Sequence, residues 1–484
     1  MMERNEDFLQ KAEALKPVLH SRFIKADGSR LPLKKGSRLC LDFGGHLVGY
    51  VTLHLSYTGS HPDAPAWLRL KFAEREQELS ENVEAYSGWI SAGWVQQEQI
   101  HADVLPCALK LPRRYAFRYL QIEVLDVSGK YDLVVESVDC EAVSSADDAS
   151  LPPYETNDPD LQQIDRIACR TLHDCMQLVF EDGPKRDRRL WMGDLRLQAL
   201  ANYQSYRNDD LVRRCLYLFA GSTLPGGRVS ACLFTEPEVE ADDTVMYDYS
   251  LFYAPTLLDY YEQTQDREVL AELWPVAWRQ IELSGKSFDE EGLVRDSDVP
   301  GWCFVDWNLT LNKQASAQGI YLYCLRAAGK IAEILGDTDK AAWIKADYEK
   351  KKQAAVRSLY DDALGLFVSG ADRQISWASQ IWMVLGGVCG GEVLHRAAET
   401  EAVSMVTPYI YHHYVQALID CGEKEKALEV LRSYWGGMVK EGADTFWERY
   451  NPDNPDESPY GGTIVNSYCH AWSCAPAYFL RKYY

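Results

Sequence analysis

The spacing of apolar residues changes part-way along the chain. Between about residues 36 and 142, short runs rich in β-branched and aromatic residues alternate apolar with polar positions, as half-buried strands do. Turn-forming segments such as 58–65 and 126–130 separate the runs, which is typical of an antiparallel sandwich. We therefore predict that residues 1–150 form a β-sandwich domain. The strand-like runs are residues 39–45, 49–57, 66–73, 115–125 and 131–143.

A polar, Pro-containing stretch over residues 144–162 indicates a linker followed by a helix start. Beyond it, apolar residues recur at i, i+3 and i+4, and no 30 to 45-residue consensus repeats, which argues against a solenoid. Paired helices of unequal length with long polar connections favour a closed toroid over residues 151–484. The helical segments are 160–180, 195–206, 210–221, 250–266, 267–283, 316–337, 341–361, 379–387, 409–422, 425–438 and 469–484.

Charge narrows the range of partners. The net charge is −22, and both parts are acidic: residues 1–150 carry 17 Lys and Arg against 22 Asp and Glu, and residues 151–484 carry 33 against 50. Nucleic acid and anionic membranes bind through clustered cations, and no Lys/Arg-rich run is present, so we expect neither as a partner. With 12% aromatic residues, the composition fits a neutral, hydroxyl-rich ligand better.

Cysteine usage and the first residues bear on location. The 13 cysteines are odd in number, lie in apolar contexts and include no CxxC pair, which favours reduced thiols. The start, MMERNEDFLQKAEALK, lacks the apolar stretch of a secretory signal, and no later run of about 18 apolar residues could span a membrane. We therefore expect a cytoplasmic protein.

The first candidate site segment covers residues 181–194, where acidic and basic residues surround a Gly-Pro turn ahead of Trp191. The plainer interpretation is a solvated loop in which Asp194 caps the next helix. However, a carboxyl group held against an indole has its ionised form disfavoured and its pKa raised, as a general acid requires. Asp187 is a candidate for that role.

Two further segments add carboxylates flanked by indoles. Glu448 lies between Trp447 and Arg449, where it could be a salt-bridged rim residue or, together with Asp187, the second carboxylate of a glycosidase. In residues 301–307, an acid follows a Pro-Gly turn between two tryptophans. Indole faces stack on sugar rings, although burial in a core is the commoner fate of Trp.

Other chemistries have no support. His412, His413 and His470 show no HExxH or comparable ligand spacing, so we expect no metal and no other cofactor. His470 could contact a ligand hydroxyl or could be structural. Serine hydrolase, P-loop and Rossmann motifs are absent from the sequence.

The segments 182–194 (DGPKRDRRLWMGD) and 443–449 (ADTFWER) resemble two signatures of glycoside hydrolase family 78, the α-L-rhamnosidases. Residues 302–307 and 466–472 are similar to two further pocket segments, in family order. The resemblance implies an (α/α)6 barrel behind the β-sandwich, and metal-independent, inverting hydrolysis of terminal α-L-rhamnosides. It places Asp187 as general acid and Glu448 as general base. The implied substrate-binding residues are Asp182, Arg186, Trp191, Asp194, Trp302, Asp306, Trp307, Trp447 and His470.

Two departures from the family pattern leave alternatives open. Many relatives carry Glu as the acid where this chain has Asp187, so Asp182 and Asp194 stay alternative acids. The chain ends directly after the last predicted helix, whereas many relatives carry further β-domains, which suggests a minimal intracellular type that could self-associate as a homodimer. The competing functions are an exo-glycosidase for another deoxy sugar or a uronide, and a non-catalytic carbohydrate-binding protein on the same fold.

Overall fold

The strand-like runs lie together in one antiparallel sheet of the computed structural model, which describes residues 2–29, 31–294 and 303–484. The strand order is β2-β7-β3-β6-β4-β5. The runs expected at 39–45 and 49–57 are one long strand whose register shifts between Asp42 and Leu47, where a bulge interrupts the pairing. The strands are β2 (His20–Asp27), β3 (Arg38–Gly59), β4 (Ala66–Ala73), β5 (Gln97–Ala102), β6 (Cys107–Asp126) and β7 (Tyr131–Ser144).

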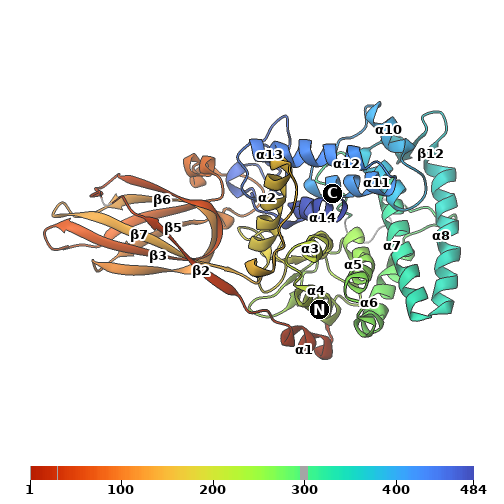
Figure 1. Ribbon diagram of the computed structural model, residues 1–484, viewed down its shortest axis with the longest axis horizontal. Helices are drawn as coiled ribbons and strands as arrows, with labels where there is room; N and C mark the ends of the chain where they lie inside the picture. The colour runs from red at the N-terminus through yellow and green to blue at the C-terminus, as the bar shows by residue number, and fades with distance from the viewer. Residues whose placement is uncertain (1, 30, 295–302) are drawn as a thin grey trace.

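The sheet has a hydrophobic core of its own. Apolar side chains at alternate positions, such as Val51, Leu53 and Leu55 on β3, are buried together with partners from β4, β6 and β7. This sheet domain forms one end of an elongated molecule, and the helices form the other end (Figure 1). The two domains meet where α2 runs beside β3 and β7.

From α5 to α12, largely buried helices alternate along the chain with more exposed ones. Helix α7 buries 14 of its 22 residues, whereas α8, which follows it, buries only five of 22. The buried helices α3, α5, α7, α9 and α11 pack against one another in chain order, and α14 packs on α3. The helices are α2 (Pro159–Cys175), α3 (Met192–Gln204), α4 (Asp209–Gly221), α5 (Tyr247–Thr264), α6 (Arg267–Gly285), α7 (Gln314–Leu335), α8 (Thr338–Leu359), α9 (Trp377–Leu385), α10 (Glu392–Ala398), α11 (Pro408–Asp420), α12 (Lys424–Val430), α13 (Gly436–Lys440) and α14 (Ala475–Tyr483).

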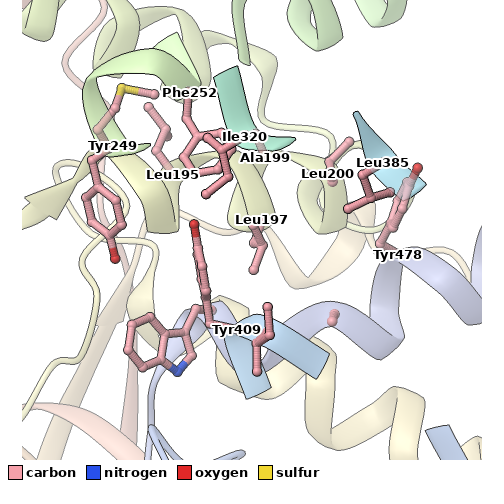
Figure 2. Close-up of a cluster of buried hydrophobic side chains, with 14 of the residues drawn as sticks. Leu195, Leu197, Ala199, Leu200, Tyr249, Phe252, Ile320, Leu385, Tyr409 and Tyr478 are labelled. Carbon is pink, nitrogen blue, oxygen red and sulfur yellow. The ribbon is translucent and has the colours of Figure 1, made fainter. Parts of the chain in front are cut away.

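Side chains from the buried helices meet in a common core. Figure 2 shows Leu195 and Leu197 of α3 with Phe252 of α5, Ile320 of α7 and Tyr409 of α11. Because every one of these helices contributes to a single core, the loops at their ends are held on a rigid frame.

Some local predictions differ from the structure. The helix expected over 160–180 ends at Cys175, because Met176 and Phe180 pair as a short antiparallel bridge instead. The seven-residue helix α10 was not predicted, since it is too short to show a helical period. Near the N-terminus, β1 (Glu3–Arg4) pairs with β9 (Ser222–Thr223) and α1 (Glu6–Ala14) packs on α4, so this segment contacts the helical domain. Among the described helices, none combines the length and apolarity needed to cross a bilayer.

Candidate active site

The loop between α2 and α3 is folded by its own main chain and by one carboxylate. The Asp182 backbone N–H donates to the Arg189 carbonyl at 3.1 Å, and the Arg189 backbone N–H donates to the Asp182 carboxylate at 3.0 Å. This closed loop carries Asp187 at its tip. Asp194, suggested as a helix cap, instead lies inside the first turn of α3, which begins at Met192.

A close approach explains the glycine before Asp194. A Cβ at Gly193 would lie 2.3 Å from the ring of Tyr249 on α5, so no larger residue fits there. The contact brings the Tyr249 hydroxyl to 3.4 Å from the Asp194 carboxylate. The first turn of α3 is thus fixed against α5, and Asp194 is fixed with it.

Two segments near the C-terminus run beside this loop. The Glu448 backbone N–H donates to the Ser467 carbonyl at 3.0 Å, and the His470 N–H donates to the Phe446 carbonyl at 2.9 Å. The next residue, Ala471, donates its N–H to the Asp182 carbonyl at 2.8 Å. Main-chain hydrogen bonds therefore connect three segments that are far apart in sequence, and this arrangement brings Asp182, Glu448 and His470 together.

These segments surround a pocket with a volume of about 250 Å³. Eight of the predicted site residues line it. They are Asp182, Arg186, Asp187, Trp191, Asp194, Trp307, Glu448 and His470. The remaining walls are largely aromatic and apolar, formed by Trp89, Ile90, Met246, Tyr249, Phe304, Tyr460 and Trp472, with Arg189, Asp242 and Thr244 as additional polar groups.

Arg186 links two carboxylates of the pocket. Its guanidinium forms an ion pair with Glu448 and lies 3.4 Å from the Asp187 carboxylate, while its Nε donates to the Val465 carbonyl at 3.1 Å. The Tyr460 hydroxyl donates a second hydrogen bond to Glu448. Burial raises the pKa of Glu448 above its ordinary value, and Arg186 and Tyr460 limit the rise.

Asp187 is the most accessible of the pocket carboxylates in contact with these groups. Its side chain is 21% exposed, against 7% for Glu448. A pair of carboxylates with different solvent access, one of them fixed by a cation and a hydroxyl, is suited to divided acid and base roles.

Asp182, Asp194 and His470 form a second group at the closed end of the pocket. The imidazole Nε2 lies 3.9 Å from the Asp182 carboxylate and Nδ1 lies 3.8 Å from the Asp194 carboxylate, which is too far for hydrogen bonding. Burial, reinforced by neighbouring carboxylates, raises the pKa of both aspartic acids well above the ordinary range. Burial and Arg186 lower the pKa of His470 well below its ordinary value.

A family model described as glycosyl hydrolase family 78 alpha-rhamnosidase N-terminal domain matches residues 11–142, and one described as bacterial alpha-L-rhamnosidase 6 hairpin glycosidase domain matches residues 152–484. The chain belongs to glycoside hydrolase family 78. The resemblance seen in its sequence motifs is thereby confirmed, and the protein is a glycoside hydrolase.

Solved structures agree with the family assignment. A rhamnosidase from Klebsiella oxytoca with rhamnose bound is 46% identical over 100% of this chain and 99% of that chain, with a TM-score of 0.96. A family 78 rhamnosidase of Bacillus sp. GL1 is 22% identical over 93% of this chain, with a TM-score of 0.78, and shares the fold. This chain matches 47% of that longer protein. Among curated proteins, the comparison found no match.

Among the described residues, two of the predicted site residues of this family 78 enzyme do not line the pocket. Asp306 accepts hydrogen bonds from the Val406 and Thr407 N–H groups at 2.8 and 3.1 Å, and from the Thr407 hydroxyl, so it organises the start of α11. Its pKa is raised to about 6 by burial. Trp447 lines a different cavity from Glu448, and its ring centroid lies 4.4 Å from the Arg75 guanidinium. Trp302 lies outside the described residues.

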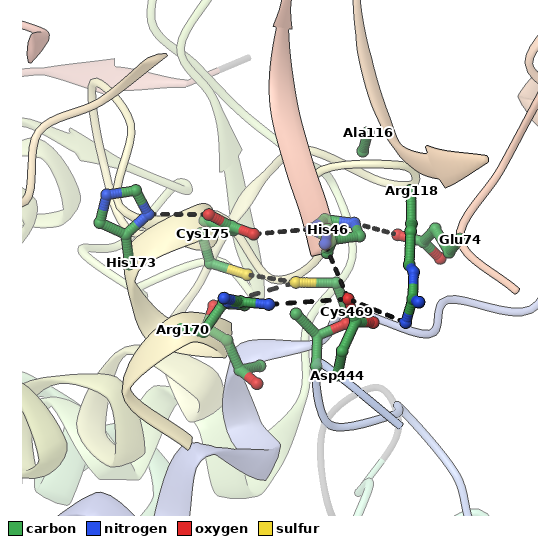
Figure 3. A network of polar contacts seen from close by, with 12 residues as sticks. His46, Glu74, Ala116, Arg118, Arg170, His173, Cys175, Asp444 and Cys469 are labelled. Atoms are coloured by element: carbon green, nitrogen blue, oxygen red, sulfur yellow. Dashed lines mark hydrogen bonds and ion pairs between the residues drawn. The ribbon is translucent and has the colours of Figure 1, made fainter. Parts of the chain in front are cut away.

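Behind the pocket, the sheet domain and the helical domain share a buried polar network (Figure 3). His46, in the bulge of β3, places Nδ1 2.7 Å from Asp174 at the end of α2 and Nε2 3.1 Å from Glu74. Burial alone would lower the pKa of His46, but neighbouring Cys469 and the two carboxylates raise it well above its ordinary value. The His46 side chain of the sheet domain therefore joins Asp174 of the helical domain.

The same region contains residue types that can bind a metal ion. His46, Asp174 and Cys469 offer nitrogen, oxygen and sulfur atoms within 4.8 Å of one another. However, both imidazole nitrogens already contact carboxylates at hydrogen-bonding distances. The arrangement is that of an ion cluster rather than of a prepared metal site.

Sequence reasoning missed the contribution of the sheet domain to the pocket. Trp89 and Ile90 come from the connection between β4 and β5, and Tyr460 comes from a turn-rich segment that showed no chemical motif. An aromatic, glycine-containing stretch, YSGWISAGW over residues 86–94, was the available signal. It interrupts an otherwise strand-like region.

Proposed function

We propose that this enzyme releases terminal α-L-rhamnose from rhamnosides by inversion, with Asp187 as general acid and Glu448 as general base. The observation that carries the proposal is the joint contact of Arg186 with both carboxylates inside one pocket of a family 78 chain. The relative from Klebsiella oxytoca, described as a rhamnosidase with rhamnose bound, supports the choice of sugar.

The two carboxyl groups divide one displacement between them. Protonated Asp187 gives its proton to the glycosidic oxygen as the bond to the anomeric carbon breaks. Ionised Glu448 takes a proton from water while that water attacks the anomeric carbon from the other face. Inversion requires the carboxyl groups to stand roughly 6.5 to 9.5 Å apart, which leaves space for the water.

Buried polar atoms without partners support a hydroxyl-rich ligand. Trp191 Nε1, Asp194 Oδ1 and His470 Nδ1 are buried and make no hydrogen bond in the described structure. A buried polar atom without a partner is costly, and ligand hydroxyls can both donate and accept. The closed end of the pocket therefore fits a sugar ring whose hydroxyls satisfy these atoms.

The uronide alternative loses its main support. Lys185 forms an ion pair with Glu78 behind the pocket, and Arg188 donates to the Arg114 carbonyl in the sheet domain. Arg189 lines the pocket but lies 3.5 Å from the Asp242 carboxylate. Lys185, Arg188 and Arg189, the three bases considered for a sugar carboxylate, thus each already contact another protein group.

A panel of p-nitrophenyl glycosides, read by NMR for the anomer that forms first, tests the sugar and the stereochemistry. We expect hydrolysis of the α-L-rhamnoside with β-L-rhamnose appearing first. Release of the α-anomer first would contradict inversion, and preference for a glucuronide or a fucoside would contradict the sugar assignment. Tight rhamnose binding without hydrolysis of any glycoside would favour a binding protein.

Substitution of the two carboxylates tests their roles. Glu448→Gln and Asp187→Asn should each lower kcat by roughly 1000-fold or more while retaining the fold, since each removes an acid or base group. The matched control is Glu441→Gln, because Glu441 is exposed and does not line this pocket. If Asp187→Asn keeps near-normal activity, the acid is instead Asp182 or Asp194.

We further propose that the helical domain closes as an (α/α)6 barrel over residues 151–484 and that, within residues 1–150, the long six-stranded sheet folds over on itself as a β-sandwich. The alternation of buried and exposed helices and the six-hairpin family model support the barrel. The boundary is supported by family matches that end at 142 and resume at 152.

Thirteen free cysteines favour the cytoplasm, and a homodimer would be tested by light scattering.

A further inference from the structure

The connection between β4 and β5 extends from the sheet domain to the mouth of the pocket. It contains three 3-10 turns, Glu76–Ser80, Val83–Ala85 and Ala92–Trp94, and between the last two Trp89 and Ile90 line the pocket wall. One wall of the active site of this enzyme therefore comes from the domain that does not carry the catalytic carboxylates.

This connection is fixed against the segment that holds Tyr460. The Trp89 indole N–H donates to the Pro459 carbonyl at 2.8 Å, and the Tyr86 hydroxyl donates to the Tyr460 carbonyl at 2.9 Å. A Cβ at Gly88 would lie 1.9 Å from the Tyr460 carbonyl oxygen, so the two backbones approach as closely as glycine allows. The indole is held in place rather than free to rotate away.

Despite this anchoring, Trp89 is 67% exposed. Its ring centroid lies 5.5 Å from that of Tyr460, whose hydroxyl donates to Glu448. A large aromatic face that is fixed in position and open to water at a pocket mouth gains free energy when a ligand covers it. Trp89 is therefore built to receive part of a ligand.

The burial of the side chains along the pocket indicates which part of the ligand lies at Trp89. The side chains of Asp182, Asp194 and His470 are at most 6% exposed, so the terminal sugar belongs at that closed end. Exposure rises to 21% at Asp187, the proposed proton donor to the glycosidic oxygen. The group beyond that oxygen is the leaving group, and Trp89 lies on the exposed side of the pocket.

We propose that Trp89, with Ile90, forms the leaving-group subsite and selects rhamnosides whose leaving group presents an apolar ring face. This inference rests on the proposed rhamnosidase function. A second pyranose and a phenolic ring both offer such a face, and both stack on indole. The sheet domain would thus determine what the rhamnose is attached to, while the helical domain determines which sugar is released.

The test compares Trp89→Ala with wild-type enzyme on three donors: α-L-rhamnosyl fluoride, whose leaving group has no ring, a rhamnosyl-glucose disaccharide, and an aryl α-L-rhamnoside. The loss in kcat/KM on a ring-bearing donor should exceed the loss on the fluoride by about 5- to 10-fold, as one aromatic stacking contact allows. Trp89→Phe should recover most of it. A larger loss on the disaccharide assigns the subsite to a pyranose, and a larger loss on the aryl glycoside assigns it to a phenolic ring.

Trp67→Ala is the matched control, because Trp67 is a partly exposed indole of the same domain that stacks on His101 and does not line the pocket. It should lower none of the three rates selectively. Equal losses on all three donors with Trp89→Ala, or no loss on any, would overturn the subsite while leaving the rhamnosidase function intact. Failure of the wild-type enzyme on all three donors would instead reject the rhamnosidase function.

Discussion

Two histidines of this enzyme are each flanked by two carboxyl groups, and their surroundings shift the pKa of the two imidazoles in opposite directions. His46 lies 2.7 and 3.1 Å from its carboxylates, whereas His470 lies 3.8 and 3.9 Å from its own. Burial lowers both pKa values, but neighbouring Cys469 and the two hydrogen-bonded carboxylates raise that of His46 overall, whereas His470 has no such bonds and Arg186 lowers its pKa further. The imidazole nitrogens of His46 are thus about 1 Å closer to their carboxylates than those of His470, and only His46 is hydrogen-bonded to them.

Replacing each histidine by glutamine tests whether the two residues have different roles. His46→Gln should lower the free energy of unfolding by about 3–5 kcal/mol, because it leaves a buried carboxylate without its cationic partner. His470→Gln should change it by only about 1 kcal/mol, while kcat/KM falls by roughly 10- to 100-fold through lost hydroxyl contacts. Urea denaturation and steady-state kinetics measure the two effects. Equal destabilisation by both variants would contradict the distinction.

Substitution of one carboxyl group beside each histidine, Asp174 beside His46 and Asp182 beside His470, tests the same difference more directly. Asp174 is ionised, with its pKa lowered by hydrogen bonds from His173 and His46 against the opposing effect of burial, whereas burial raises the pKa of Asp182. Asp174→Asn should therefore cost about 3 kcal/mol of stability, because it removes a charge from a buried pair. Asp182→Asn should cost less than about 1 kcal/mol, since an amide replaces a neutral carboxyl of the same shape. If Asp182→Asn is the more damaging variant, Asp182 is ionised.

The pH dependence of stability gives the smallest effect and the clearest sign. Because the folded pKa of His46 is raised, its stabilising contribution is complete below its ordinary pKa and is lost as pH rises through the folded value. The difference in unfolding free energy between wild type and His46→Gln should therefore narrow toward alkaline pH. A difference that widens instead would show that His46 is neutral at neutral pH.

Much of the fold could be predicted from the sequence, because the spacing of apolar residues within a segment depends on which of its faces are buried. The strand-like runs and the long helices appear where the spacing predicted them, since each buries one face or all faces against neighbours. The merging of two runs into β3 was not readable. Residues 43–46 carry turn-forming glycines, and only the pairing of the flanking segments with β6 shows that they form a bulge inside one strand.

The site was readable to the extent that its residues share a short motif. Asp182, Arg186 and Asp187 lie in one loop, so their proximity follows from sequence. Glu448 and Trp447 are neighbours, yet the sequence does not tell which of the two faces the pocket. Contacts between distant segments, such as that of Trp89 with the carbonyl of Pro459, leave no local pattern.

Lys185 illustrates how far the two domains depend on each other. Its side chain is 2% exposed, and the carboxylates near its ammonium group, Glu78 and Glu74, both belong to the sheet domain. The counter-charges of Lys185, which lies two residues before Asp187 in the same loop, are therefore supplied across the domain boundary. For recombination or engineering, the two domains behave as one unit: a helical domain joined to a foreign sheet domain would keep the proposed catalytic carboxylates but would lose the carboxylates that pair with Lys185.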